Sequence, residues 1–185
     1  CLIKDFSFSN EDNLNNIIRK VFIMMKDYGD ELIQQAKKMD REQLATMRKK
    51  HFNVSKFIFF VLRNLNRIGY VDNKKTNVVY QIFSSMDEIL DVEKYISGYL
   101  IDFSQKKLNK NTINIIQEIH SCFCVFYEYY YKPKSKLLTE FQNNRWNIIY
   151  DVRKIAKQNY PRNEIVIVTE MKYILELLFD MFEAR

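Results

Sequence analysis

Two short acidic pairs occupy matching places in the two halves of the chain. Asp87 and Asp91 form the first pair, and Glu176 and Asp180 form the second. Within each pair the carboxylates are four residues apart, which places both on one face of a helix. Such carboxylates can hold hard or borderline cations, and several pairs on neighbouring helices make a multinuclear oxygen site. These four acids are therefore candidate metal ligands, and the alternative is that they are charges on solvated helix faces.

A second cluster of metal-binding residue types lies in the second half. His120, Cys122 and Cys124 place three soft or borderline donors within five residues, as in zinc or copper sites. On a helix, however, His120 and Cys124 share a face and Cys122 points away. Both cysteines also lie in an apolar run, where cysteine behaves as a small hydrophobic residue. We therefore predict that this cluster packs in the core.

An aromatic run, 126–131, precedes Lys132 and Lys134. Rings beside lysines could stack on nucleic-acid bases or lie against lipid headgroups. Tyrosines at a helix end more often pack their rings and leave the hydroxyls in water, and this is the interpretation that we favour.

Composition points to a folded helical protein. The 185 residues are 47% hydrophobic and include only three Gly and two Pro, too few turn-forming residues for an all-β fold. No apolar run approaches the ~20 residues of a membrane span, which predicts a soluble chain. The net charge of +6 is spread along the sequence, which argues against nucleic-acid binding. No phosphate-binding glycine loop, Ser-His-Asp arrangement or zinc-protease motif occurs, so we predict that the protein is not an enzyme.

Three cysteines, Cys1, Cys122 and Cys124, are an odd number and indicate a reducing compartment rather than a disulfide framework. The sequence begins with Cys1 and not with Met. It is therefore either a piece of a longer chain or a mature lipoprotein whose first residue carries the lipid, and the sequence leaves both open.

Hydrophobic periodicity predicts six helices. Ser9 and Asp12 have the spacing of a capping pair for the first helix, and Asp40 is the expected cap of the second. The segment Ile165–Val168 has strand-forming residues but no partner strand, so we assign it to a helix. The predicted helices cover about 9–38, 40–69, 76–103, 112–131, 134–158 and 161–185.

The two halves resemble one another. A shift of about 94 positions aligns Phe52 with Trp146 and Val54 with Ile148, and a shift of about 89 aligns the two acidic pairs. We expect an all-α fold in which residues 1–106 and 107–185 form two repeated three-helix units of one elongated bundle. Because any two amphipathic helices can be aligned in this way, a true duplication and a chance match both remain open.

At these motifs the chain resembles the PhoU family and the PhoU-like regions of phosphate transporters. The family carries Glu or Asp followed four residues later by Asp on the third helix of each of two three-helix repeats. The segments Asp87–Asp91 and Glu176–Asp180 match this signature, and Asp40–Ala45 resembles the start of the family's second helix. The glycine usual before the final Asp is replaced here by Leu90 and Phe179.

The resemblance implies a regulator of phosphate uptake, either free-standing or attached to the transporter itself. Its partners would be a phosphate transporter, in cis or in trans, and a sensor kinase, and a homodimer is also open. Metal-binding members hold iron or zinc clusters, here through Asp87, Asp91, Glu176 and Asp180. We expect a cytoplasmic location at the inner face of the cell membrane, with membrane contact only through the transporter.

Two other functions compete with this one. The chain could be the helical binding module of a surface lipoprotein anchored through Cys1. It could instead be a metal-free interaction scaffold, in which the acidic pairs are ordinary surface charges.

Overall fold

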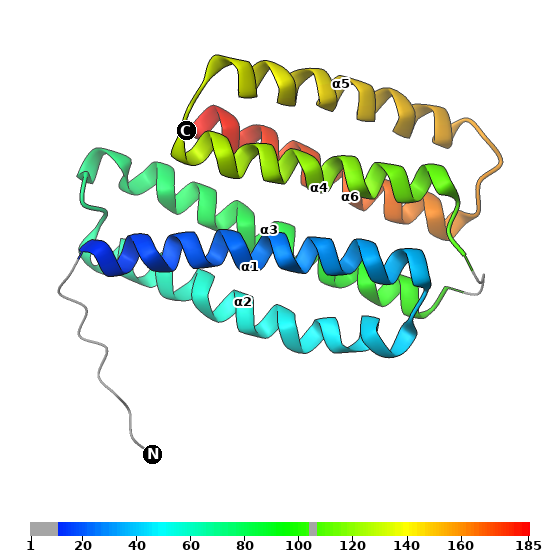
Figure 1. Ribbon diagram of the computed structural model, residues 1–185, viewed down its shortest axis with the longest axis horizontal. Helices are drawn as coiled ribbons and strands as arrows, with labels where there is room; N and C mark the ends of the chain where they lie inside the picture. Colours follow the sequence, from blue (N-terminus) through cyan, green and yellow to red (C-terminus); the bar gives the residue numbers. More distant parts are fainter. Residues whose placement is uncertain (1–10, 104–106) are drawn as a thin grey trace.

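The computed structural model describes residues 11–103 and 107–185, and these residues form helices and connecting loops without a strand (Figure 1). The all-α prediction is confirmed, and Ile165–Val168 lies within the sixth helix. The helices are α1 (Glu11–Lys38), α2 (Arg41–Ile68), α3 (Thr76–Ile101), α4 (Lys110–Tyr131), α5 (Ser135–Ala156) and α6 (Arg162–Ala184), with a short 3-10 helix, η1 (Asn73–Lys75), before α3.

Local capping explains where several helices begin and end. Asp40 is the N-cap of α2, as predicted, and its carboxylate accepts a hydrogen bond from the Gln43 backbone N–H at 3.1 Å. Gly69 ends α2 with a φ of 83°, a conformation that glycine adopts without steric cost. Ser9, the predicted cap of the first helix, lies outside the described residues.

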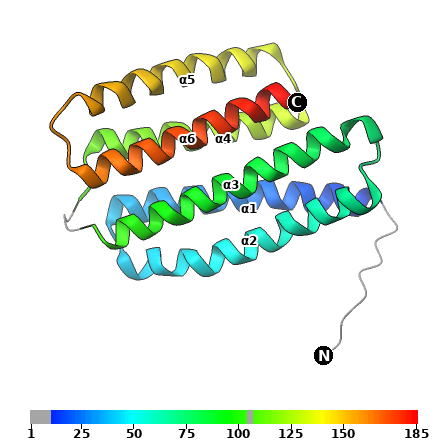
Figure 2. The ribbon, with the colours of Figure 1, turned by 180° about the vertical axis from the view of Figure 1, so that it is seen from behind.

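The six helices run roughly along the long axis of the molecule and pack in two groups (Figures 1 and 2). Helices α1, α2 and α3 contact one another, and so do α4, α5 and α6. The groups meet where α1 packs on α4 and α3 packs on α6. The division into two repeats at residues 106 and 107, and the duplication itself, stay predictions.

Aromatic rings fill the core where the groups meet. Phe22 of α1 is 1% exposed, and its ring centroid lies 4.9 Å from that of Tyr130 on α4. Phe182 of α6 stacks on Phe141 of α5 at 4.1 Å and meets Phe126 of α4 edge-on at 5.0 Å. Burial of such large rings is a major source of stability. The contact of Phe22 with Tyr130 joins the two groups, whereas the contacts of Phe182 lie within the group of α4, α5 and α6.

The last residue lies close to the first turns of α1. Asn15 and Arg185 both line a cavity of about 390 Å³, and the Arg185 side chain donates a hydrogen bond from Nε to the Tyr130 carbonyl at 3.1 Å. The described chain therefore returns to the end of the bundle at which α1 begins (Figure 1).

Candidate functional site

The first acidic pair lies between α3 and α2. Asp91 Oδ1 lies 2.8 Å from His51 Nε2 and accepts a hydrogen bond from Lys94 Nζ at 2.5 Å. Asp87 Oδ1 accepts a hydrogen bond from Ser55 Oγ at 3.3 Å. Because a carboxylate only accepts, the contact with Asp91 requires the proton of His51 on Nε2. Both Asp87 and Asp91 therefore have partners on the neighbouring helix.

The second acidic pair lies between α6 and α5. Glu176 Oε2 accepts a hydrogen bond from Arg145 Nη2 at 2.5 Å, and Glu176 Oε1 lies 3.3 Å from Lys172 Nζ. Asp180, one turn further along α6, is exposed, and its side chain makes no hydrogen bond or ion pair with the other described residues. The two acids of this pair thus differ: Glu176 is held by two basic groups, whereas Asp180 faces solvent.

The basic neighbours decide the protonation of these acids. Burial, together with the nearby charge of Asp91, raises the pKa of Asp87 above its ordinary value. Burial also acts to raise the pKa of Asp91, but the hydrogen bonds from Lys94 and His51 outweigh it and lower this pKa. Arg145 and Lys172 lower the pKa of Glu176 in the same way, against the effect of burial. Asp91 and Glu176 are therefore anions stabilised by cations of the protein.

These contacts bear on the predicted iron or zinc cluster. In the first pair the carboxylate oxygens and the nearby imidazole are groups that can coordinate a metal cation. Lys94, however, already donates a hydrogen bond to Asp91 Oδ1. In the second pair both carboxylate oxygens of Glu176 face basic groups. Among the described residues no set of three or more His, Cys, Asp or Glu side chains is arranged to hold a metal ion. Metal binding by Asp87, Asp91, Glu176 and Asp180 stays a prediction, and it requires basic side chains to move away.

Helices α2 and α5 present the same arrangement to the two acidic pairs. His51 on α2 and Arg145 on α5 are related by the shift of 94 positions, and each contacts an acid of the adjacent pair. Each precedes an exposed aromatic residue, Phe52 at 54% and Trp146 at 62%. The match is approximate, because His51 reaches the second acid of its pair and Arg145 the first.

The two acidic pairs lie on one face of the molecule. Tyr173 of α6 donates a hydrogen bond to Glu88 Oε2 of α3 at 2.7 Å, across the boundary between the two helix groups. Figure 2 shows α3 crossing in front of α1, and α6 in front of α4. We call this surface, formed by α2, α3, α6 and α5, the acidic face; its polar residues are His51, Ser55, Asp87, Glu88, Asp91, Lys94, Arg145, Lys172, Tyr173, Glu176 and Asp180.

The prediction that the His-Cys cluster packs in the core is confirmed for His120 and Cys122, whereas Cys124 is only half-buried. Cys122 is fully buried, and burial raises the pKa of its thiol to about 12. His120 Nε2 lies 3.1 Å from Asp30 Oδ1 and 4.0 Å from Cys124 Sγ, so His120 and Cys124 do share one face. Burial lowers the pKa of His120 and raises that of Cys124. Neutral thiols beside a neutral imidazole do not form an activated nucleophile.

The sequence alone did not identify the partners of the acidic pairs. His51, Ser55, Lys94 and Arg145 were not predicted as site residues, and only the shift of 94 positions could have related His51 to Arg145. The buried acid Glu93 of α3 was also missed. It is 6% exposed and lies against Gly29 of α1.

Comparison of the chain with protein-family models, curated proteins and solved structures finds no match. Within residues 11–103 and 107–185, none of the helices combines the length and the hydrophobicity that crossing a membrane requires.

Proposed function

We propose that this chain is a PhoU-like regulatory domain that tunes phosphate uptake by contact with a phosphate transporter, either free-standing or as part of the transporter chain. The observation that carries the proposal is the acidic face. On it, α2 with α3 and α5 with α6 each present an acidic pair, a basic partner and an exposed aromatic residue. A sensor kinase is the second proposed partner.

The surface composition supports a protein contact rather than catalysis. Exposed aromatic residues on these four helices include Phe52, Tyr95, Trp146, Tyr150 and Tyr173, all between 45% and 69% exposed. Aromatic and arginine side chains are enriched at the centres of protein interfaces, where they contribute most of the binding energy. The charges beside them are already paired, as at Arg145 and Glu176, which reduces the cost of removing them from water. The proposed contact does not depend on metal.

The proposal is tested by the uptake of radiolabelled phosphate in host cells that lack the gene. We expect unregulated uptake in these cells and normal control after return of the wild-type gene. A Phe52→Ser, Trp146→Ser double variant should fail to restore control, because it removes the two matched aromatic side chains. Ile23→Ser is the matched control: Ile23 is 45% exposed but lies on α1, away from the acidic face.

Circular dichroism and thermal unfolding of the purified variants establish that each one is folded. Unchanged phosphate uptake after deletion of the gene would reject the phosphate function and leave the interaction scaffold. Full restoration by the double variant would keep the function but reject the acidic face as the contact surface. A signal peptide directly upstream of Cys1 would favour the surface lipoprotein instead.

A further inference from the structure

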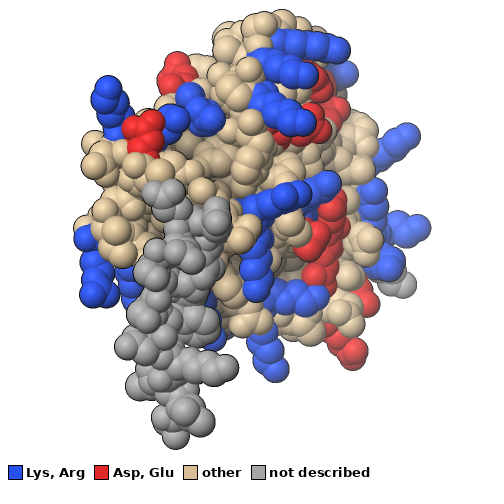
Figure 3. Space-filling model, turned by 60° about the vertical axis from the view of Figure 1, so that its left-hand side comes forward, with Lys and Arg blue, Asp and Glu red and all other residues tan. Residues whose placement is uncertain are grey.

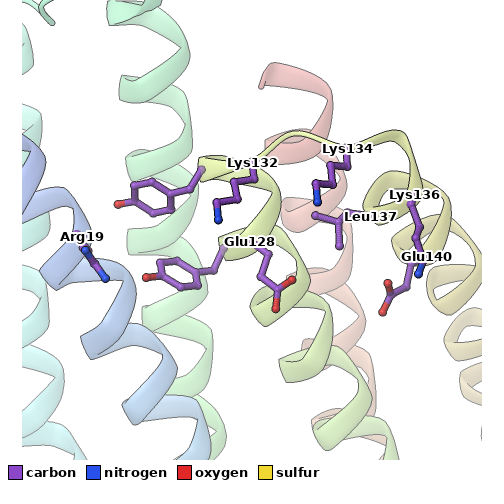
Figure 4. A pocket seen from close by; sticks show the side chains of 9 residues that line it. Arg19, Glu128, Lys132, Lys134, Lys136, Leu137 and Glu140 are labelled. Carbon is purple, nitrogen blue, oxygen red and sulfur yellow. The ribbon is translucent and has the colours of Figure 1, made fainter.

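A basic cavity opens where α4 turns into α5, at the end of the bundle opposite the α1–α2 turn (Figures 1 and 4). Its volume is about 710 Å³, within the range of ~300–1,000 Å³ that is typical of small-molecule sites. One wall comes from Arg19 of α1, and the rest comes from α4, the turn and α5. The cavity therefore spans the two groups of helices.

The cavity carries excess positive charge. Arg19, Lys132, Lys134 and Lys136 line it together with only two acids, Glu128 and Glu140. Within the part of the chain that the structure describes, none of these four basic residues forms an ion pair. Figure 3, which looks toward this end of the molecule, shows Lys and Arg side chains crowded on its upper part. Such unpaired cations attract an anion.

An aromatic wall faces these cations. Tyr127 and Tyr131 are one helical turn apart, with ring centroids 5.4 Å apart, and both rings pack against Phe22. Tyr131 keeps 44% of its surface exposed, so part of its ring is available to a ligand. Burial raises the pKa of Tyr131 to about 12, although Arg19 acts against this shift. The Tyr131 hydroxyl is therefore a hydrogen-bond donor at neutral pH.

We propose that this cavity binds a nucleoside phosphate. The phosphates would lie against Lys132 and Lys134, whose side chains extend into the same space in Figure 4. The flat base would stack on the exposed part of the Tyr131 ring, as bases do on aromatic side chains. The carboxylate of Glu128 is placed to accept hydrogen bonds from ribose hydroxyls. This site is separate from the acidic face and does not rest on its proposed function.

Isothermal titration calorimetry of the full chain with ATP, tripolyphosphate and adenosine, which measures the affinity for each ligand, tests the proposal. We expect ATP to bind most tightly, because only ATP offers both the phosphates and the base. A Lys132→Ala, Lys134→Ala variant should weaken ATP binding at least about tenfold, since it removes two phosphate contacts. Tyr131→Ala should weaken the binding of ATP but not that of tripolyphosphate.

The matched control is Lys37→Ala, Lys38→Ala, which removes the same charge from exposed lysines in the last turn of α1, far from the cavity. Thermal unfolding midpoints verify that all variants are folded. Absence of ATP binding at millimolar concentration would overturn the proposal. If the control variant weakened ATP binding as much as Lys132→Ala, Lys134→Ala does, binding would depend on net charge alone and not on this cavity. If tripolyphosphate bound as tightly as ATP, the base would have no role in binding.

Discussion

Glu93 is the residue whose environment departs most from that of an ordinary glutamate. Its carboxyl group lies inside the protein, and no described residue donates a hydrogen bond to its Oε2. Burial raises the pKa of Glu93 to about 8, because the charged form is poorly solvated there. Glu93 is therefore mostly protonated at neutral pH, as an uncharged acid beside Gly29 and His120.

This environment predicts a pH-dependent stability. The pKa of Glu93 is higher in the folded state than its ordinary value of 4.5. Glu93 therefore makes its full favourable contribution to the free energy of unfolding below about pH 4.5, and this contribution is lost as the pH rises towards 8. Between pH 5 and pH 8.5 we expect the wild type to lose free energy of unfolding on the order of a few kcal/mol, and we expect Glu93→Gln not to show this loss. Urea unfolding at pH 5 and pH 8.5 measures this difference. Exposed Glu183→Gln is the control, and an identical pH response of wild type and Glu93→Gln would contradict the assignment.

Gly29 provides a second prediction at a single residue. A Cβ atom added at Gly29 would lie 2.2 Å from His120 Nδ1, whereas one added at Gly98 would meet nothing within 4 Å. Both glycines are helical, and alanine is the better helix former, so Gly98→Ala should stabilise the protein by roughly 0.5–1 kcal/mol. Gly29→Ala should instead destabilise the protein by about 1–3 kcal/mol, because the His120 ring must move. Measurement of the free energy of unfolding of both variants tests this prediction. A Gly29→Ala variant more stable than the wild type would show that the His120 ring moves aside without an energetic cost.

At the scale of a helix, the two faces of α1 differ sharply. Phe22 is 1% exposed and packs on rings of α3 and α4, while the next residue, Ile23, is 45% exposed. We expect Phe22→Ala to lower the free energy of unfolding by about 3–5 kcal/mol. Ile23→Ala should change it by no more than about 0.5 kcal/mol. Chemical denaturation measures both, and similar losses would mean that α1 is not docked through this face.

The helices themselves could be predicted closely from the sequence. Asp40 and Gly69 mark the two ends of α2 by local chemistry. The other observed helix ends lie within two residues of the predicted positions, apart from the start of the first helix, which was predicted at Ser9, outside the described residues. The acidic pairs could also be located, because a spacing of four residues places two side chains on one helix face. Their partners on the neighbouring helices could not: Asp91 is 40 residues from His51, and Glu176 is 31 from Arg145. Only the packing of neighbouring helices brings these residues together.

At the scale of the whole molecule, metal binding competes with the protein's own cations. If the acidic pairs bind iron or zinc, Lys94 and Arg145 must first release Asp91 and Glu176. We therefore expect a Lys94→Met, Arg145→Met variant to bind Zn²⁺ more tightly than the wild type. An Asp91→Asn, Asp180→Asn variant should lose whatever metal the wild type holds.

Elemental analysis after purification without chelator, followed by titration with Zn²⁺, measures both effects. Metal content that is unchanged by Asp91→Asn, Asp180→Asn would exclude these acids as ligands. Metal content at background in every variant would leave the acidic face as a surface for protein contact alone.

The position of Arg185 beside the first turns of α1 has a consequence for chain connectivity. Because Arg185 and Asn15 of α1 line one cavity, a flexible linker of about ten residues can join residue 185 to residue 11. New ends could then be opened in the connection between α3 and α4, because the two groups of helices also contact each other through α1 on α4 and α3 on α6. Such a circular permutant should fold with the same helix content and a similar melting temperature. The protein would then fold whichever group of helices is synthesised first, because the two groups associate through the packing of their helices.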